Sequence, residues 1–283
     1  MSHFAVAVIV HDGGCLDDLL APYQENNMGD CPRQYLEFVN TEDEHREDYE
    51  TETIRKVKTP DGRLLWLWDE TFRVPGTIGR GTDTHKVPDG AGYEVVDVKA
   101  SELYPTFEIY MADYCGYDDG PDPETGKYGY WENPNKKWDW WQVGGRYSNW
   151  FKSKDGRKVN DCQVKDLDRT TDEDAYKKAL RFWEIVVEGS PLATGEDEPF
   201  NMYKPKYYVD QYGTKENYAA EQASDAPWAF ITPDGVWHEK GRMGWFAAND
   251  ATRDSRQAFA KKWEAAIAEA APDDWVVLVD CHI

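Results

Sequence analysis

Phe4-Ala5-Val6-Ala7-Val8-Ile9-Val10 lies at the start of the chain, and Trp275-Val276-Val277-Leu278-Val279-Asp280-Cys281-His282-Ile283 forms its last nine residues. Short apolar runs rich in β-branched residues are typical of buried strands. The first run ends at His11-Asp12-Gly13-Gly14, a turn sequence. Because both ends of the chain read as strands, we expect them to share one sheet, with the middle of the chain inserted between them.

Three helices and two tight turns are predicted. Thr170 and Thr171 precede three acids, which is a capping signal, and the apolar residues that follow at helical spacing end at Gly189. A second helix is expected from about 252 to 271, and a shorter one from 215 to 223. The sequence Thr-Pro-Asp-Gly occurs at 59–62 and at 232–235 and predicts a turn at each place.

The predicted fold class is α+β: a helix-backed mixed or antiparallel sheet formed by both chain ends, with an inserted middle region rich in loops and hairpins. We assign residues 1–40 and 150–283 to the core domain and residues 41–149 to an inserted acidic and aromatic arm region. Within it, residues 75–92 and 116–136 are rich in Gly, Pro, Asp and Asn and are expected to be exposed loops or arms.

Composition excludes several classes of protein. The 283 residues include 54 Asp and Glu against 32 Lys and Arg, a formal charge of -22, which argues against a basic face that holds nucleic acid directly. The 13 Trp, 17 Tyr and 10 Phe supply enough apolar area for a core. No apolar run approaches the roughly 18 residues that cross a bilayer, so no membrane partner is expected. Five scattered Cys without a CxxC indicate a reducing cytoplasm.

The acids are concentrated in two segments. Residues 17–52 have a balance of -10, and residues 100–126 hold seven acids and no Lys or Arg, so together they account for 17 of the 22 excess charges. This is either a solvated face that aids solubility or a surface for a basic partner. In the second interpretation, the partner-binding residues are Glu42, Asp43, Glu44, Glu47, Asp48, Asp118, Asp119, Asp122, Tyr130 and Trp131.

A Trp-rich passage offers an alternative site. Residues 131–141 contain four Trp and are followed by Gly144-Gly145-Arg146. A ligand pocket here would use Trp138, Asp139, Trp141, Arg146 and His238. We favour the other interpretation, a packed core with an internal Arg–Asp pair, because no second catalytic group lies at a recognisable spacing.

No catalytic residue, cofactor or metal is predicted, because nucleotide-binding loops, zinc motifs and nucleophile elbows are all missing. Pairing of the terminal strands would bring His3 near Asp280 and His282. Cys281 and His282 would point to opposite faces of their strand and would not work as a pair.

The motifs Met1-Ser2-His3-Phe4, Trp138-Asp139-Trp140-Trp141-x-x-Gly144-Gly145-Arg146 and Val279-Asp280-Cys281-His282-Ile283 resemble a family of bacteriophage proteins without an assigned activity. This resemblance implies a phage origin and the cytoplasm of the infected host cell. The layout of terminal strands around an inserted middle is also similar to phage inhibitors of the Gabija defence system. Those inhibitors assemble into oligomers around the defence nuclease complex, which implies a homo-oligomer and a protein partner here. No motif residue matches them, so no site carries over.

The sequence therefore predicts a non-enzymatic phage inhibitor of a host antiviral defence complex, which blocks DNA access to a nuclease through acidic surfaces that imitate DNA. The alternative is a small-molecule sponge or hydrolase, for example for a nucleotide, with its pocket at the Trp-rich passage.

Overall fold

The computed structural model describes residues 2–74, 84–90, 92–244 and 248–283. Two compact units are present: the terminal unit, Met1–Leu36 with Asn133–Ile283, and the insertion, Glu37–Glu132. Together they form an α+β protein, as predicted. The insertion ends at residue 132 and not at the predicted 149, because β9 (Trp140–Val143) pairs with the final strand β15 (Trp275–His282).

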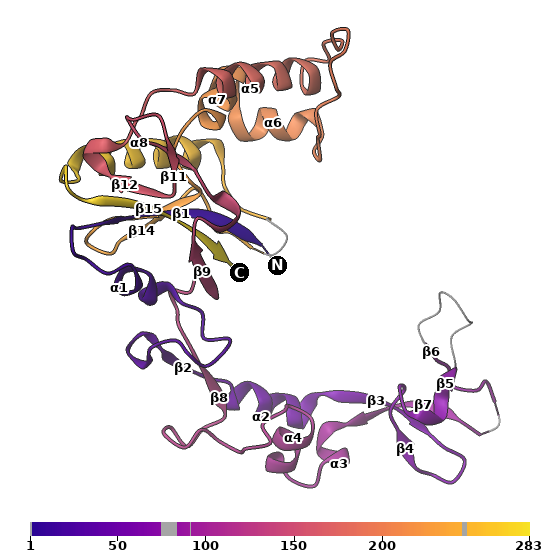
Figure 1. The fold of residues 1–283 in the computed structure, drawn as a ribbon. Coiled ribbons are helices and arrows are strands. Elements are labelled where there is room, and N and C mark those ends of the chain that lie inside the picture. Colours follow the sequence, from indigo (N-terminus) through magenta and orange to yellow (C-terminus); the bar gives the residue numbers. More distant parts are fainter. Residues whose placement is uncertain (1, 75–83, 91, 245–247) are drawn as a thin grey trace. The chain divides into compact units, whose positions relative to one another are not determined.

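The terminal unit is built on a six-stranded mixed sheet with both chain ends at its centre (Figure 1). Strand β1 (His3–Val10) pairs antiparallel with β15, from His3 opposite His282 to Val10 opposite Trp275. On its other side β1 pairs in parallel with β13 (Ala229–Ile231), which pairs with β14 (Trp237–Glu239). Both β12 (Asp161–Gln163) and β9 pair with β15. The predicted sharing of one sheet by the chain ends is confirmed.

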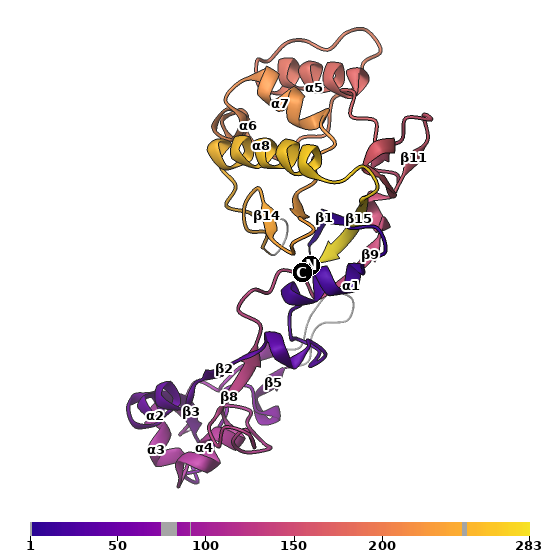
Figure 2. The ribbon, with the colours of Figure 1, turned by 90° about the vertical axis from the view of Figure 1, so that its left-hand side faces the viewer.

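Each face of this sheet is buried by a different helix. Side chains along β1 point alternately to the two faces of the sheet and so form two apolar rows. One row is Ala5, Ala7 and Ile9, and the other is Phe4, Val6 and Val8. The first row packs on α8 (Arg253–Glu269), and the second row packs near α1 (Leu16–Leu20). Figures 1 and 2 both place α8 between the sheet and a further layer of helices, which is made of α5 (Glu173–Val186), α6 (Pro205–Tyr212) and α7 (Lys215–Gln222).

The three predicted helices are confirmed, and each begins at a capped residue. The Thr252 side chain accepts from the Ser255 N–H at the start of α8, in a reciprocal capping box. Asp172 caps α5, two residues after the first predicted threonine, and Thr214 caps α7. Such caps stabilise a helix by about 1 kcal/mol each. A short hairpin of β10 (Phe151–Lys152) and β11 (Lys158–Val159) completes the terminal unit.

The insertion is a small α+β module of its own. Its three-stranded sheet has the order β4 (Leu64–Leu65), β3 (Thr53–Lys58), β7 (Glu94–Lys99). Two ribbons pair β2 (Glu37–Asn40) with β8 (Gly129–Glu132) and β5 (Arg73–Val74) with β6 (Thr84–His85). The helices α2 (Glu42–Thr51), α3 (Ala100–Leu103) and α4 (Phe107–Asp113) accompany a core rich in aromatic residues.

The loops follow the predictions in part. Both Thr-Pro-Asp-Gly turns form, with Gly62 and Gly235 at φ values of 86° and 83° that favour glycine. Most of the segment predicted as an exposed loop or arm at 116–136 is irregular, but residues 129–132 pair with β2 as strand β8. Of the other predicted arm, 75–92, residues 75–83 and 91 lie outside the described part of the chain.

We expect Gly145→Ala to destabilise the terminal unit. Gly145 has a φ of 52°, and an added Cβ would lie 2.4 Å from the Asp280 carboxylate. Left-handed backbone costs alanine about 1–2 kcal/mol, and the clash adds to that cost. Gly156→Ala is the matched control, because Gly156 also has a positive φ but open space around it. Urea unfolding followed by Trp fluorescence should show the larger loss for Gly145→Ala. Equal losses would contradict the close approach to Asp280.

Candidate functional site

The five residues predicted for the alternative ligand pocket are spread over both faces of the central sheet. Trp138 is 4% exposed and packs with Trp141 in the core beside α1. His238 stacks on Phe230, at 4.7 Å, on the face that packs against α8. The Arg146 side chain is exposed. The interpretation of Trp138 as core is therefore confirmed.

The predicted Arg–Asp pair is replaced by two His–Asp pairs. Asp139 Oδ1 lies 2.6 Å from His282 Nδ1, and Asp280 Oδ1 lies 2.9 Å from His3 Nδ1. The backbone N–H of Arg146, and not its guanidinium, donates to Asp280. The two imidazole centroids are 4.9 Å apart, as expected from the pairing of the chain ends. These contacts tie β9 and both termini together.

Within the described ranges, neither this histidine cluster nor any other group of three or more His, Cys, Asp or Glu side chains is arranged to hold a metal ion. Cys281 lies in the core on the opposite face from His282, as predicted, and burial raises the pKa of its thiol well above the ordinary value. A thiol of this kind stays protonated and unreactive. All five cysteines are free.

The acidic residues predicted to bind a partner lie largely on α2. This helix has the sequence Glu-Asp-Glu-His-Arg-Glu-Asp-Tyr-Glu-Thr and is anchored by few side chains. The Tyr49 hydroxyl donates to the Tyr104 carbonyl, at 2.9 Å, and the Arg46 guanidinium lies over the Phe107 ring, at 4.2 Å. Arg46 also bonds Glu42 and thereby lowers the pKa of that carboxyl. Packing on α3 and α4, and not helix propensity, therefore holds α2 in place.

Four other acids of α2 have no ion-pair partner among the described residues. Asp43, Glu44, Glu47 and Glu50 are exposed and form no ion pair with any described residue. Asp43, Glu47 and Glu50 are spaced by four and three residues, so they lie on one side of the helix. Like charges at this spacing, and an acid near the C-terminal end such as Glu50, destabilise a helix, whereas Asp43 in the first turn is favourable. Glu47 and Glu50 therefore add negative charge to this side of α2 at a cost in stability.

The second acidic segment joins the first at the start of α2. The Thr41 hydroxyl and the Tyr117 hydroxyl are 2.9 Å apart, which places the beginning of the helix next to the loop that holds Asp118 and Asp119. Both of these carboxylates are exposed. We call Asp43, Glu44, Glu47, Glu50, Asp118 and Asp119 the acidic surface. Residues 37–52 and 100–132 have a combined balance of -14, whereas residues 53–99 between them have +1.

Two of the predicted partner-binding residues, Asp122 and Trp131, contact each other within the insertion. The Trp131 Nε1–H donates to Asp122 at 2.9 Å, and its ring packs edge-on against Phe38 at 5.2 Å. Partial burial opposes ionisation of Asp122, but hydrogen bonds from Thr125, Trp131 and Glu124 outweigh it and lower the pKa of the carboxyl. Tyr130, by contrast, is 49% exposed.

Sequence reasoning missed an exposed aromatic stack in the insertion. Trp68 is 61% exposed and stacks on Trp66 at 4.6 Å, and Trp66 in turn stacks with Tyr114. The buried Lys56 ammonium lies over the Trp66 ring, and burial lowers the pKa of that lysine. Exposed Trp residues on rigid supports are frequent anchors at interfaces.

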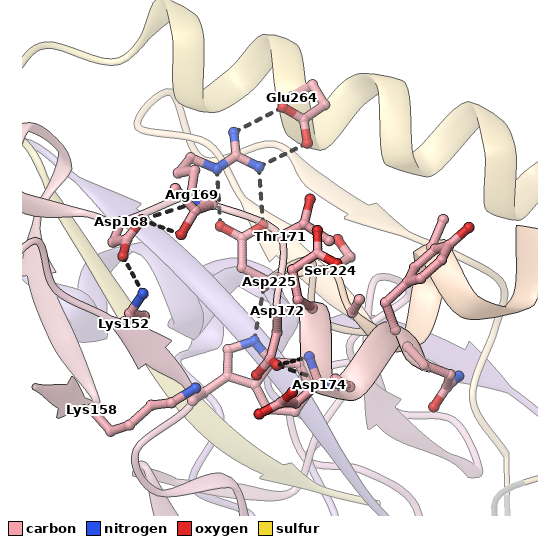
Figure 3. Close-up of a pocket in the computed structure, with 18 residues that line it drawn as sticks. Lys152, Lys158, Asp168, Arg169, Thr171, Asp172, Asp174, Ser224, Asp225 and Glu264 are labelled. Atoms are coloured by element: carbon pink, nitrogen blue, oxygen red, sulfur yellow. Dashed lines mark hydrogen bonds and ion pairs between the residues drawn. The ribbon is translucent and has the colours of Figure 1, made fainter. Parts of the chain in front are cut away.

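A cavity of about 790 Å³ lies beside the start of α5 in the terminal unit (Figure 3). Arg169 lies between Asp225 and Glu264 and donates two bonds to each carboxylate, at 2.8–3.0 Å. Lys152 pairs with Asp168 at 2.6 Å and thereby lowers the pKa of that carboxyl. Six carboxylates and three cations line the cavity. Its charged groups mainly hold structural elements together, so this cavity is the weaker candidate site.

We expect the double substitution Glu47→Gln, Glu50→Gln to stabilise α2. It removes the like-charge pairs and the acid near the C-terminal end of the helix, and it keeps Asp43, whose charge is favourable in the first turn. The gain should be about 0.5–1 kcal/mol in local opening free energy. Native-state hydrogen exchange of the α2 amides measures this directly. Faster exchange in the variant would show that these acids stabilise the helix. It would contradict the conclusion that they lower the stability of α2.

No protein-family model, curated protein or solved structure matches the chain. No helix in the described ranges is long and apolar enough to span a membrane.

Proposed function

We propose that the protein is a non-enzymatic inhibitor whose insertion occupies the basic nucleic-acid path of a nuclease. The acidic surface carries this proposal, because its carboxylates are exposed, have no partner within the described chain, and are held on one module by packed aromatic residues. A basic protein groove would supply the missing counter-charges and gain long-range attraction to the insertion.

The spacing of the charges supports competition with nucleic acid. At 1.5 Å per residue, Asp43, Glu47 and Glu50 follow each other along the α2 axis by about 6 and 4.5 Å. One strand of DNA carries a phosphate for each 3.4 Å of axis. The distance along the axis between neighbouring charges of Asp43, Glu47 and Glu50 is therefore of the same order as the distance between phosphates along a nucleic-acid strand. Trp68 and Tyr130 would add apolar contacts beside it.

The resemblance of the chain to phage proteins gives the proposal its biological setting. A phage product in the cytoplasm of an infected cell would meet host antiviral defence systems, and several of these cut nucleic acid. We extend the proposal to a defence nuclease complex such as Gabija as the partner and to a homo-oligomer as the active form. The protein would block DNA access without itself holding nucleic acid.

Co-expression with a panel of host defence nucleases, including Gabija, tests the proposal. We expect a nuclease to co-purify with the chain, to be released by duplex DNA, and to bind more weakly as salt rises. Asp43→Asn, Glu47→Gln, Glu50→Gln should weaken binding about tenfold or more at 0.15 M salt, since three ion pairs at about 0.5 kcal/mol each exceed 1.4 kcal/mol.

The matched control is Asp197→Asn, Glu198→Gln, Glu269→Gln, which changes the net charge equally at exposed acids of the terminal unit. It should leave binding within about twofold of the original. Equal weakening by both triple variants would show that only net charge matters. Binding that is indifferent to salt and to DNA would overturn the proposed competition.

A further inference from the structure

A second cavity, of about 300 Å³, lies in the terminal unit where α6 and α7 meet the first half of α8. Its volume equals that of about ten water molecules. It is within the range of small-ligand pockets, which begins near 300 Å³. Unlike the cavity beside α5, it is lined by more cations than carboxylates: Lys240, Arg253 and Arg256 against Glu221 and Glu264.

Two of its cations are buried and share one carboxylate oxygen. Lys240 and Arg256 are each 8% exposed. Lys240 Nζ donates to Glu221 Oε1 at 2.9 Å, and Arg256 Nη1 donates to the same oxygen at 2.7 Å. Arg256 Nε also donates to Gln211, at 3.3 Å. No second carboxylate pairs with either cation among the described residues.

The other carboxylate of the cavity, Glu264, is paired with Arg169, which it shares with Asp225. Glu264 lines both cavities, and both of its oxygens accept hydrogen bonds from Arg169 (Figure 3). Arg253 adds a half-exposed cation, whose Nε is 3.6 Å from Asp254. The group of Lys240, Arg256 and Glu221 therefore has a net positive charge in the interior of a chain with a net charge of -22.

Buried charge without a counter-charge is costly. Burial lowers the pKa of Lys240, and Glu221 opposes that effect. The rings of Tyr212 and Phe259 line the same cavity and lie near the cations, with the Arg256 guanidinium 4.9 Å from the Tyr212 centroid. The cavity thus combines buried donors, an excess of positive charge and aromatic walls.

We infer that this cavity binds a small organic oxyanion, with Lys240 and Arg256 on the anionic group and Tyr212 and Phe259 beside its body. Arginine presents a planar set of donors that fits carboxylate and phosphate oxygens, and lysine adds a point charge. The inference concerns the terminal unit and is independent of the acidic surface on the insertion.

Calorimetric titration of the full chain with inorganic phosphate, adenosine monophosphate and succinate tests this inference. We expect at least one probe to bind, and the comparison distinguishes phosphate from carboxylate recognition and shows whether a ring system is needed. Lys240→Met keeps most of the side-chain volume and should weaken binding at least tenfold. Lys158→Met is the matched control, because Lys158 lines the cavity beside α5 and should leave binding unchanged.

Glu221→Gln separates a binding site from a purely structural ion cluster. Removing the internal carboxylate leaves both cations without a counter-charge, so the probe should bind more tightly while the unliganded protein melts at a lower temperature. The melting temperature should recover on addition of the probe. Failure of all three probes to bind both the original chain and Glu221→Gln would overturn the inference. So would tight binding that survives Lys240→Met.

Discussion

The antiparallel pairing of β1 with β15 is the constraint on which the rest of the structure depends. It joins eight residue pairs from the two ends of the chain, and closing a loop of about 260 residues costs about 5 kcal/mol plus a constant. Burial of apolar rows on both faces of the two strands offsets this cost. With both termini at the centre of one sheet, the sequence between them must supply the outer strands and both covering layers. The chain leaves the terminal unit after Leu36, forms the insertion, and re-enters the terminal unit at Asn133.

The same pairing brings the histidines and aspartates near the termini together. His3, Asp280 and His282 are adjacent because of the register, and Asp139 joins them because β9 continues the pairing along β15. Asp280 is fully buried and accepts hydrogen bonds from a side chain and from the backbone. Removing one partner from such a group costs more than forming the bond contributes. These groups therefore hold the chain ends together.

Local signals in the sequence were enough to predict the terminal strands, the capped helices and the exposure of the α2 acids, since a carboxylate without a partner cannot be buried. Contacts between distant segments were not predictable. Trp131 pairs with Phe38 across a ribbon, and residues 140–143 join the terminal sheet only through β15. The cation cluster draws Glu221 from α7, Lys240 from the end of β14 and Arg256 from α8. No spacing in the sequence reveals that these three side chains meet.

A net charge of -22 does not exclude an anion site in the same chain, because the effect of each charge on a bound anion depends on its distance and its exposure to solvent. Exposed charges are screened beyond about 8 Å at physiological salt. A cation about 4 Å from a bound oxyanion contributes about 4 kcal/mol at an effective dielectric constant of 20. Lys240 and Arg256 would act at that short range and are largely shielded from solvent, whereas the carboxylates of the acidic surface are exposed to solvent and to its screening ions. One sequence can therefore carry an acidic surface for a basic partner and a separate interior site for an anion.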